Sequence, residues 1–280
     1  MKTSIQTLLI ILFISITQLN AQQSNKISLY DDLKINETYS LVGDNVNLRA
    51  KPYTTSKELT RLRIGFEVTI ISKTDVVFKS GDDVTCWYEV SYKGQKGYIS
   101  GKFIAHKAIK TDTHSFLFGR KMSKEFGDEL IIRTLVGTDY SNYKENFLRL
   151  RGSVISVALI GNSELKNVQH ILFINYHGES CGAENGRTYF FLKDTDELVH
   201  IADLASSGDP NYFEEETFTF MKYDQNTQPS IVFKREESEI IDNENFWRET
   251  KSLTRSFEWD GTKLVPEFSK RYERPEKSNE

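Results

Sequence analysis

The sequence predicts an all-β protein in which a small barrel is followed by a larger, mainly antiparallel β domain. The chain contains 18 Phe and 13 Tyr, aromatic residues that are enriched in half-buried strands. Its apolar residues form short β-branched and aromatic runs that end at glycine or proline, as strands do. Amphipathic helix periodicity is almost absent. A length of 280 residues allows one large domain or two modest ones.

The charge of the chain is nearly balanced, because 36 Lys and Arg residues stand against 40 Asp and Glu residues and the net charge is −4. A protein dedicated to nucleic acid would need a basic patch to neutralise phosphates. The 5 Pro residues and the lack of long single-residue runs argue against a mostly disordered chain. The composition therefore indicates a folded protein, and we expect no nucleic-acid partner.

Residues 1–21 have the features of a secretory signal peptide. Lys2 supplies the positive start, residues 8–14 are apolar, and Ala21 is a small residue suited to signal peptidase. The apolar run 7–19 is shorter than the roughly 20 residues that a membrane-spanning helix needs. We therefore expect export to the periplasm or the outside of the cell, with no transmembrane segment in the mature chain. Since no Cys follows the predicted cut, no lipid anchor is expected.

Cys86 and Cys181 are the two cysteines of the chain, and two interpretations of them stay open. In an oxidising compartment they could form a disulfide, whose long loop would add about 4–5 kcal/mol in the chain-entropy model. Alternatively, they are small apolar side chains in separate cores. Cys86 precedes Trp87 in a predicted strand, which favours burial of an unpaired thiol.

Residues 37–106 are predicted to form the first domain, from short strands joined by glycine turns. We expect 79–83 to be a polar loop and 93–96 to be a tight hairpin connection. The predicted strands are 46–51, 59–62, 66–71, 86–92 and 97–100. The expected core residues are Trp87, Val90, Tyr98 and Ile99, with Val46 and Leu48 opposite them.

Four blocks of this domain stand in a characteristic order: Val46-Asn47-Leu48-Arg49 with Pro52, Ile64-Gly65, Trp87-Tyr88-Glu89-Val90, and Gly97-Tyr98-Ile99. This order resembles the bacterial SH3 domain, the SH3b family of exported proteins, over about a quarter of the chain. The resemblance implies a compact SH3-like barrel with an accessory role. Members of the family commonly bind cell-wall peptides or glycans and often stand beside an enzyme that they target to the wall. Residues 73–85 are predicted to be a loop that is longer and more charged than is usual in this family.

The candidate ligand-binding residues of this domain are Tyr53, Tyr88, Tyr92 and Tyr98. An exposed tyrosine combines an apolar face with a polar tip, which suits a sugar or a peptide. The alternative interpretation is that the inward-facing ones simply fill the core. Because successive side chains of a strand alternate between its faces, Tyr88 shares its face with Val90.

Residues 114–268 are predicted to form a second, β-rich domain of no family that we recognise. The lysine-rich stretch 105–113 is expected to be a linker, and 122–126 a short helical turn. Asp260-Gly261 between two alternating runs predicts a hairpin. No clear internal repeat is present. The predicted strands are 130–136, 152–160, 168–176, 187–192, 216–221, 229–234, 254–259 and 262–265.

The loop 177–184 is the candidate for catalysis, because its Cys181 follows His177 and precedes His200. A nucleophilic cysteine needs a nearby base. However, the cysteine peptidases found beside SH3b domains place this residue at the start of a buried helix, whereas a strand follows here. A metal site from the His, Cys and two Glu of the loop matches no known spacing. We therefore expect no catalytic residue, no metal and no cofactor.

These features favour a non-enzymatic binding module of the cell envelope, which holds peptidoglycan, through its peptide or its glycan, or another envelope protein. The alternative is a cell-wall cysteine hydrolase that uses the Cys181 loop. In a third interpretation, the SH3-like unit packs against its neighbour as a structural cap. The acidic runs 214–216 and 236–237 are expected to be solvated strand ends.

Overall fold

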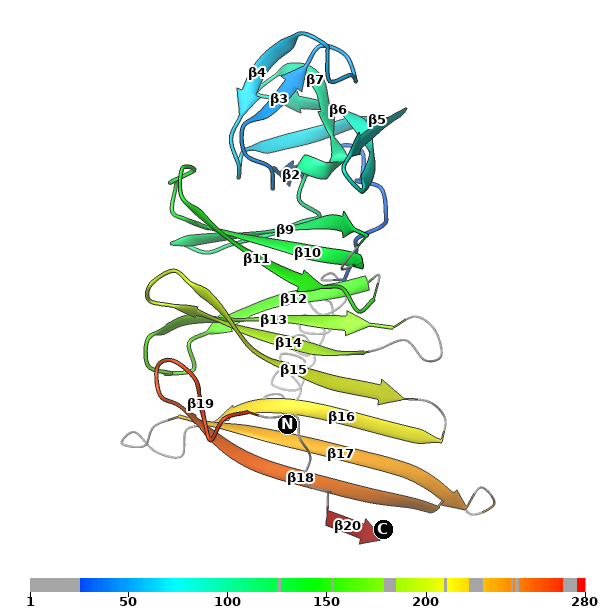
Figure 1. Ribbon diagram of the computed structural model, residues 1–280, viewed down its shortest axis with the longest axis vertical. Coiled ribbons are helices and arrows are strands. Elements are labelled where there is room, and N and C mark those ends of the chain that lie inside the picture. The colour runs from blue at the N-terminus through cyan, green and yellow to red at the C-terminus, as the bar shows by residue number, and fades with distance from the viewer. Residues whose placement is uncertain are drawn as a thin grey trace, which may run out of the picture.

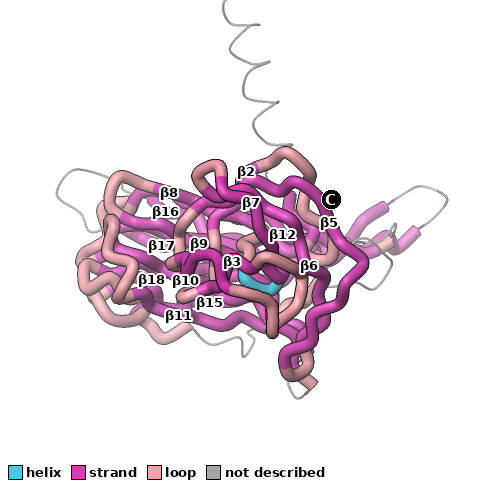
Figure 2. The backbone as a smooth tube through the Cα atoms, turned by 90° about the horizontal axis from the view of Figure 1, so that it is seen from above, coloured by secondary structure: helices cyan, strands magenta, loops and turns pink. Residues whose placement is uncertain are grey.

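The computed structural model describes residues 26–124, 127–152, 154–178, 185–208, 211–221, 229–242, 244, 247–268 and 276–279. Strands make up almost all of the regular structure, and the one helix among these residues is the three-residue η1, Gly101–Phe103 (Figure 2). The predicted all-β class is therefore confirmed. No helix in the described part of the chain has the length and apolar character needed to span a bilayer. The predicted signal peptide lies outside the described residues.

Three sheets follow one another along the long axis of the molecule (Figure 1). A six-stranded sheet occupies one end, a four-stranded sheet lies next to it, and a ten-stranded sheet extends to the other end. In the last two sheets, most neighbouring strands are consecutive in the chain and antiparallel. This meander is the larger, mainly antiparallel part that the sequence predicts.

The six-stranded sheet forms the small barrel, in the order β2-β5-β6-β7-β3-β4. Gly97 allows β7 to approach β3, because a Cβ at this position would stand only 2.7 Å from the Leu48 side chain. The strands are β2 Thr38–Ser40, β3 Val46–Arg49, β4 Glu58–Leu62, β5 Glu67–Ser80, β6 Asp83–Tyr92 and β7 Gln95–Ser100. The core consists of Leu33, Leu41, Val46, Leu48, Leu62, Val68, Ile70, Tyr88, Val90, Ile99 and Ile104.

Most of the predicted barrel core is confirmed, namely Val46, Leu48, Val90 and Ile99. Trp87 is also buried, but it lies outside this core, with its ring edge-on to Phe78 and 5.5 Å between centroids. The prediction that Tyr98 lies in the core is wrong. Its neighbours Gly97 and Ile99 take the buried positions of β7, so that Tyr98 is half-buried on the outer face.

Two segments predicted to be irregular are strands instead. The predicted loop 73–85 belongs to a long hairpin in which β5 and β6 continue to a turn at Gly81-Asp82. Its strand character is hidden in the sequence, because a bulge interrupts the pairing and charged side chains take the exposed positions. The predicted linker 105–113 contains β8, Lys107–Lys110, which pairs with the following strand.

The four-stranded sheet has the order β11-β10-β9-β8. The predicted helical turn at 122–126 is wrong for Met122, which lies in β9, because β9 and β10 pair as far as Ser123 and Gly127. Besides β8, the strands are β9 His114–Ser123, β10 Gly127–Val136 and β11 Tyr143–Arg149.

The ten-stranded sheet has the order β1-β12-β13-β14-β15-β16-β17-β18-β19, and β20 also pairs with β18. The predicted hairpin at Asp260-Gly261 is confirmed between β18 and β19. The strands are β1 Lys26–Ser28, β12 Val154–Gly161, β13 Val168–His177, β14 Asn185–Lys193, β15 Leu198–Gly208, β16 Tyr212–Met221, β17 Ser230–Asp242, β18 Trp247–Trp259, β19 Leu264–Val265 and β20 Glu276–Asn279.

The central strands β13 and β14 are buried on both faces, which explains their continuous apolar sequence. On one face, Phe190 and Leu192 pack in a core that includes residues of β9 and β10. On the other face, Tyr189 and Phe191 pack with an aromatic cluster that reaches Trp259 of β18. The ten-stranded sheet is therefore curled, because β14 and the later strands β16 to β18 share this second core.

The prediction that the acidic runs are solvated strand ends is wrong for three glutamates. Arg235 of β17 forms ion pairs with Glu214, at 3.1 Å, and with Glu237. Glu216 accepts a 2.7 Å hydrogen bond from the Ala205 amide. This bond joins β15 to β16 next to the three residue pairs at which these strands meet. The acidic residues thus stabilise the curled sheet.

Candidate functional site

Two of the four candidate tyrosines lie on the outside of the barrel. Tyr53 is 53% exposed in the turn between β3 and β4, and Tyr98 is half-buried on the outer face of β7. Arg49 of β3 pairs with Tyr98, and its Nη1 donates a 2.7 Å hydrogen bond to the Ser56 carbonyl in the turn that carries Tyr53. Glu89 of β6 pairs with Tyr98 from the other side. We call Tyr53, Tyr98, Arg49 and Glu89 the outer tyrosine surface.

The other two candidate tyrosines, Tyr88 and Tyr92, pack against the barrel core. Tyr88 is only 5% exposed, and its hydroxyl accepts a 3.4 Å hydrogen bond from the Leu33 amide. Burial raises the pKa of Tyr88. Tyr92 stacks on Phe66 with 5.7 Å between ring centroids. The structure therefore separates the four tyrosines into an accessible pair and an inward pair.

The barrel rests on the four-stranded sheet through a compact apolar contact. Val42 and Ile64 of the barrel pack with Leu117 of β9 and Leu135 of β10, and all four side chains are buried. Gly119 of β9 permits this close approach, because a Cβ there would stand 3.0 Å from Val42. We call this contact the junction.

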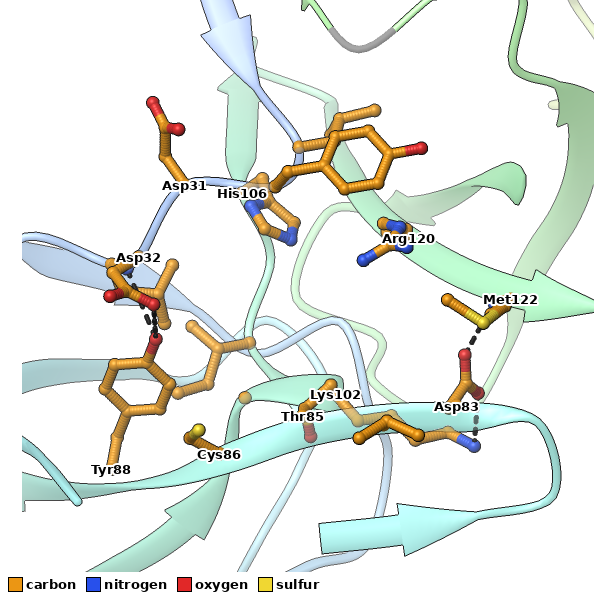
Figure 3. A pocket seen from close by; sticks show the side chains of 16 residues that line it. Asp31, Asp32, Asp83, Thr85, Cys86, Tyr88, Lys102, His106, Arg120 and Met122 are labelled. Atoms are coloured by element: carbon orange, nitrogen blue, oxygen red, sulfur yellow. Dashed lines mark hydrogen bonds and ion pairs between the residues drawn. The ribbon is translucent and has the colours of Figure 1, made fainter. Parts of the chain in front are cut away.

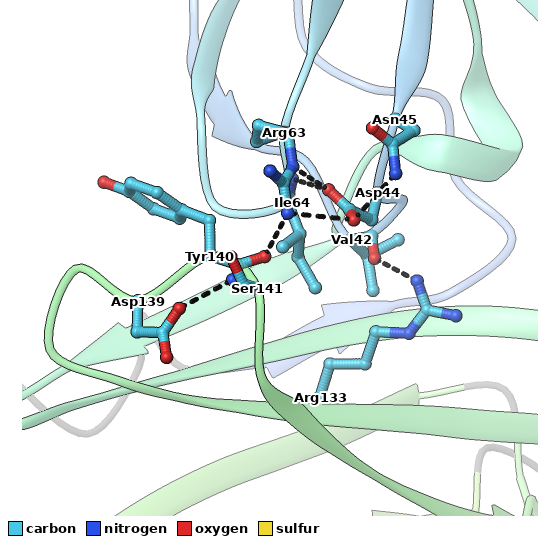
Figure 4. A network of polar contacts seen from close by, with 9 residues as sticks. All are labelled: Val42, Asp44, Asn45, Arg63, Ile64, Arg133, Asp139, Tyr140 and Ser141. Atoms are coloured by element: carbon cyan, nitrogen blue, oxygen red, sulfur yellow. Dashed lines mark hydrogen bonds and ion pairs between the residues drawn. The ribbon is translucent and has the colours of Figure 1, made fainter.

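Charged groups surround the junction and fix its orientation (Figure 4). Arg63 pairs with Asp44 at 2.7 Å and donates a 2.6 Å hydrogen bond to the Tyr140 carbonyl. Arg133 of β10 donates to the Val42 carbonyl from below the barrel. Although burial opposes it, hydrogen bonds from Arg63 and from backbone amides lower the pKa of Asp44. The junction is therefore a defined interface and not a flexible connection.

The long β5–β6 hairpin makes a second connection to β9. Asp83 is 7% exposed, and its carboxylate pairs with Lys102 at 2.7 Å. The same carboxylate accepts a 2.6 Å hydrogen bond from the Met122 amide. Asp82 accepts a 3.0 Å hydrogen bond from the Lys124 amide. The hairpin thus holds the barrel and the four-stranded sheet together at a point away from the junction.

A cavity of about 190 Å³ lies where the barrel, β9 and the N-terminal segment meet (Figure 3). Its walls include segment 29–33, Cys86 of β6, Lys102 of η1 and Arg120 of β9. Because the barrel and the four-stranded sheet each contribute a wall, this cavity exists only while the two are held together.

Arg120 is built rigidly into the wall of this cavity. Its Nε and Nη2 donate hydrogen bonds of 3.3 and 3.0 Å to Asp128. Its guanidinium lies over the Tyr30 ring, 4.1 Å from the centroid, and the Tyr30 hydroxyl donates to the same Asp128 carboxylate. Burial, followed by the hydrogen bond to Asp128, raises the pKa of Tyr30. The cation is thus stacked, paired and oriented.

His106 lines the cavity together with Arg120. Burial, followed by the positive charge of Arg120, lowers the pKa of His106 to about 4, while the negative charge of Asp31 opposes the shift. The imidazole is therefore neutral at pH 7, and it can both donate and accept a hydrogen bond. The positive charge of Arg120 and the negative charge of Asp31 therefore both act on this ring.

Two exposed carboxylates, Asp31 and Asp32, also line the cavity. Asp32 pairs with Lys73 at 2.7 Å and accepts a 3.3 Å hydrogen bond from the Tyr88 hydroxyl. Asp31 forms no ion pair within the described part of the chain. A wider groove of about 710 Å³ also reaches these two carboxylates and His106, and therefore adjoins the cavity.

The catalytic alternative depends on Cys181, which lies outside the described residues. The two histidines proposed to accompany it have other partners. His177 forms a 2.9 Å hydrogen bond with the Ser156 hydroxyl, and His200 pairs with Asp203 at 3.3 Å. Hydrogen bonds and the charges of its partners hold the pKa of Asp203 at about 2 against the effect of burial.

The remaining sequence candidates concern cysteine chemistry and metals. Cys86 is a half-buried thiol in the cavity wall and forms no disulfide within the described residues. Across the residues that the structure describes, no three His, Cys, Asp or Glu side chains are grouped so that they could hold a metal ion.

The sequence gives little indication of the cavity. Tyr30 and Arg120 lie far apart in the chain, and Arg120 stands in a strand that was not predicted. The one available signal is the run Tyr30-Asp31-Asp32, in which an aromatic residue is followed by two carboxylates just before the barrel.

Comparison with known proteins identifies one part of the chain. A family model for the bacterial SH3 domain matches residues 44–105, which include β3 to β7 of the barrel. No curated protein and no solved structure matches the chain. The barrel is therefore a bacterial SH3 domain, and the chain is a protein that carries one.

Proposed function

We propose that this protein is exported and acts in the cell envelope as a non-enzymatic binding protein, whose SH3 domain holds peptidoglycan. The observation that carries the proposal is the match of residues 44–105 to the bacterial SH3 domain, a family typically linked to cell-wall binding. The signal-peptide features of residues 1–21 support export.

The outer tyrosine surface is the part of the domain best suited to this ligand. Tyr53 and Tyr98 offer aromatic faces that can pack on sugar rings, and their hydroxyls can bond to polar groups. Arg49 lies between them and can bind a carboxylate of a wall peptide, while Glu89 can bind an ammonium group. The inward pair, Tyr88 and Tyr92, serves the barrel core and is not part of the proposed contact.

Co-sedimentation of the mature chain with isolated peptidoglycan tests the proposal. We expect the wild type to sediment with the wall material, and Tyr53→Ala combined with Tyr98→Ala to reduce the bound fraction at least about tenfold. Phe147→Ala is the matched control, because Phe147 is 46% exposed on β11, away from the SH3 domain. This variant should sediment like the wild type.

A wild-type chain that stays in solution at low and moderate salt would overturn the wall-ligand proposal. If the double variant and the control bind equally, the outer tyrosine surface is not the part of the SH3 domain that contacts the wall. The hydrolase alternative has its own readout. Cys181→Ala should leave binding unchanged, and release of wall peptides that stops in this variant would favour the alternative.

A further inference from the structure

The cavity beside Arg120 is a second site, independent of the outer tyrosine surface. It is enclosed by three parts of the molecule, and ion pairs fix two of its walls: Lys102 with Asp83, and Lys73 with Asp32. Its volume of about 190 Å³ is below the roughly 300–1,000 Å³ of pockets that hold drug-sized ligands. The occupant is therefore small, of the size of one or two amino acids.

One side of the cavity is suited to a carboxylate. Arg120 uses Nε and Nη2 on Asp128, and its side chain also interacts with the Tyr30 hydroxyl, so Nη1 is the nitrogen that a ligand would engage. The guanidinium already stands in a fixed orientation over Tyr30, so that little freedom is lost when a ligand binds. A carboxylate at Nη1 would gain a charge-assisted hydrogen bond. The neutral His106 can add a further hydrogen bond.

The other side is suited to an ammonium group. Asp31 and Asp32 lie across His106 from Arg120 (Figure 3). Asp31 is exposed and forms no ion pair in the described part of the chain, so its charge is available to a ligand. A ligand with only negative or only positive charge is disfavoured, because an anion would face these carboxylates and a cation would face Arg120.

We propose that this cavity binds a small zwitterion, an amino acid or dipeptide, with its carboxylate at Arg120 and its ammonium group at Asp31 and Asp32. The adjoining groove, which reaches the same carboxylates, supplies the entrance. Binding would join segment 29–33, the SH3 domain and β9, because each contributes a contact. The ligand would therefore also stabilise the arrangement of the two regions.

Calorimetric titration of the full mature chain with alanyl-alanine tests this proposal. The probe is compared with its N-acetylated form, which lacks the ammonium group, and with its C-terminal amide, which lacks the carboxylate. We expect the free dipeptide to bind, and each blocked form to bind at least about tenfold more weakly. Asp31→Asn should weaken binding of the free dipeptide by a similar factor and leave binding of the N-acetylated form unchanged.

Two further variants complete the design. Asp112→Asn removes the same charge from an exposed position outside the cavity, and it should bind the dipeptide like the wild type. Arg120→Lys keeps the charge but loses the planar group. It should weaken binding of the free dipeptide more than binding of the C-terminal amide. Circular dichroism confirms that each variant is folded.

No heat of binding from the free dipeptide at about 10 mM would overturn the proposal, as would equal binding of the blocked forms or of Asp31→Asn. These outcomes leave the wall proposal untouched, because Asp31→Asn should still sediment with peptidoglycan. Conversely, the variant lacking Tyr53 and Tyr98 should bind the dipeptide normally even if it no longer sediments.

Discussion

The SH3 domain and the ten-stranded sheet bury their apolar residues in different ways. In the barrel, alternate residues of each strand point inward, and one small core holds the strands together. In the sheet, Phe190 and Leu192 of β14 face one core while Tyr189 and Phe191 face another. A strand buried on one face needs an alternating sequence, whereas a strand buried on both faces needs a continuous apolar one.

The small size of the barrel suggests that contact with its neighbour adds to its stability. A domain of its size buries a smaller fraction of its surface than a large domain does, and its stability is correspondingly marginal. Val42 and Ile64, which lie outside the barrel core, pack against the four-stranded sheet. The structure therefore supports the interpretation that the SH3 domain is also a structural cap, in addition to the binding role proposed for it.

The largest effect is expected in the doubly buried part of the sheet. Phe191→Ala removes a fully buried ring that contacts Trp259 edge-on, with 5.0 Å between ring centroids. The loss of burial and the cavity left behind should lower the free energy of unfolding by about 3–5 kcal/mol, measured by urea titration. Phe147→Ala, at an exposed position, should change it by less than about 0.5 kcal/mol. Similar values for both would contradict two-sided burial of β14.

The second effect is a pH dependence that arises beside the junction. The pKa of His106 is about 4 in the folded state and about 6.5 in the unfolded state, so only the unfolded state binds a proton between these values. Stability is therefore complete above about pH 6.5 and falls as the pH is lowered to about 4, by up to about 3 kcal/mol. His106→Gln should flatten this fall in urea titrations at several pH values.

Two other histidines act in the same direction and remain in this variant. Burial lowers the pKa of His170 and of His177, so a reduced slope should persist in His106→Gln. An unchanged slope would show that His106 is solvated and that the barrel does not cover it.

A smaller effect separates the junction from the rest of the barrel. Ile64→Val removes one buried methyl group at the junction and should cost about 0.5–1.5 kcal/mol. Hydrogen exchange should rise in β3 to β7 while β13 and β14 stay protected, because the cap loosens first. Ile160→Val, at a more exposed position of β12, is the control. Equal exchange throughout would indicate that barrel and sheet unfold as one unit.

The fold was predictable where burial in a core alone determines the sequence of a strand. The SH3 blocks and the apolar runs of β13 and β14 were predicted, because core burial determines their sequence. The strands that were missed include three long ones, β9, β11 and β15. In β11, charged residues occupy much of an edge strand, and in β15 a bulge at Ile201 breaks the alternation. Such strands are specified by their partners more than by their own residues.

The candidate sites were predicted only in part. Tyr53 and Tyr98 are on the surface as a ligand contact requires, but sequence alone could not separate them from the inward pair. The cavity escaped prediction for a different reason. Arg120 and Tyr30 meet only because β9 supports the barrel, and that contact depends on Gly119 and Val42 approaching closely.

The smallest effect concerns whether a covalent bond joins the two regions. Cys86 belongs to the SH3 domain, Cys181 follows β13, and a disulfide between them would link barrel and sheet. Since Cys86 forms no disulfide within the described residues, Cys86→Ala should cost less than about 1 kcal/mol, and a reducing agent should not change the stability of the wild type. A structural disulfide would instead contribute about 2–5 kcal/mol and be lost on reduction. Urea titration with and without reductant, together with thiol counting in the denatured chain, therefore decides whether packing alone holds the SH3 domain on the sheet.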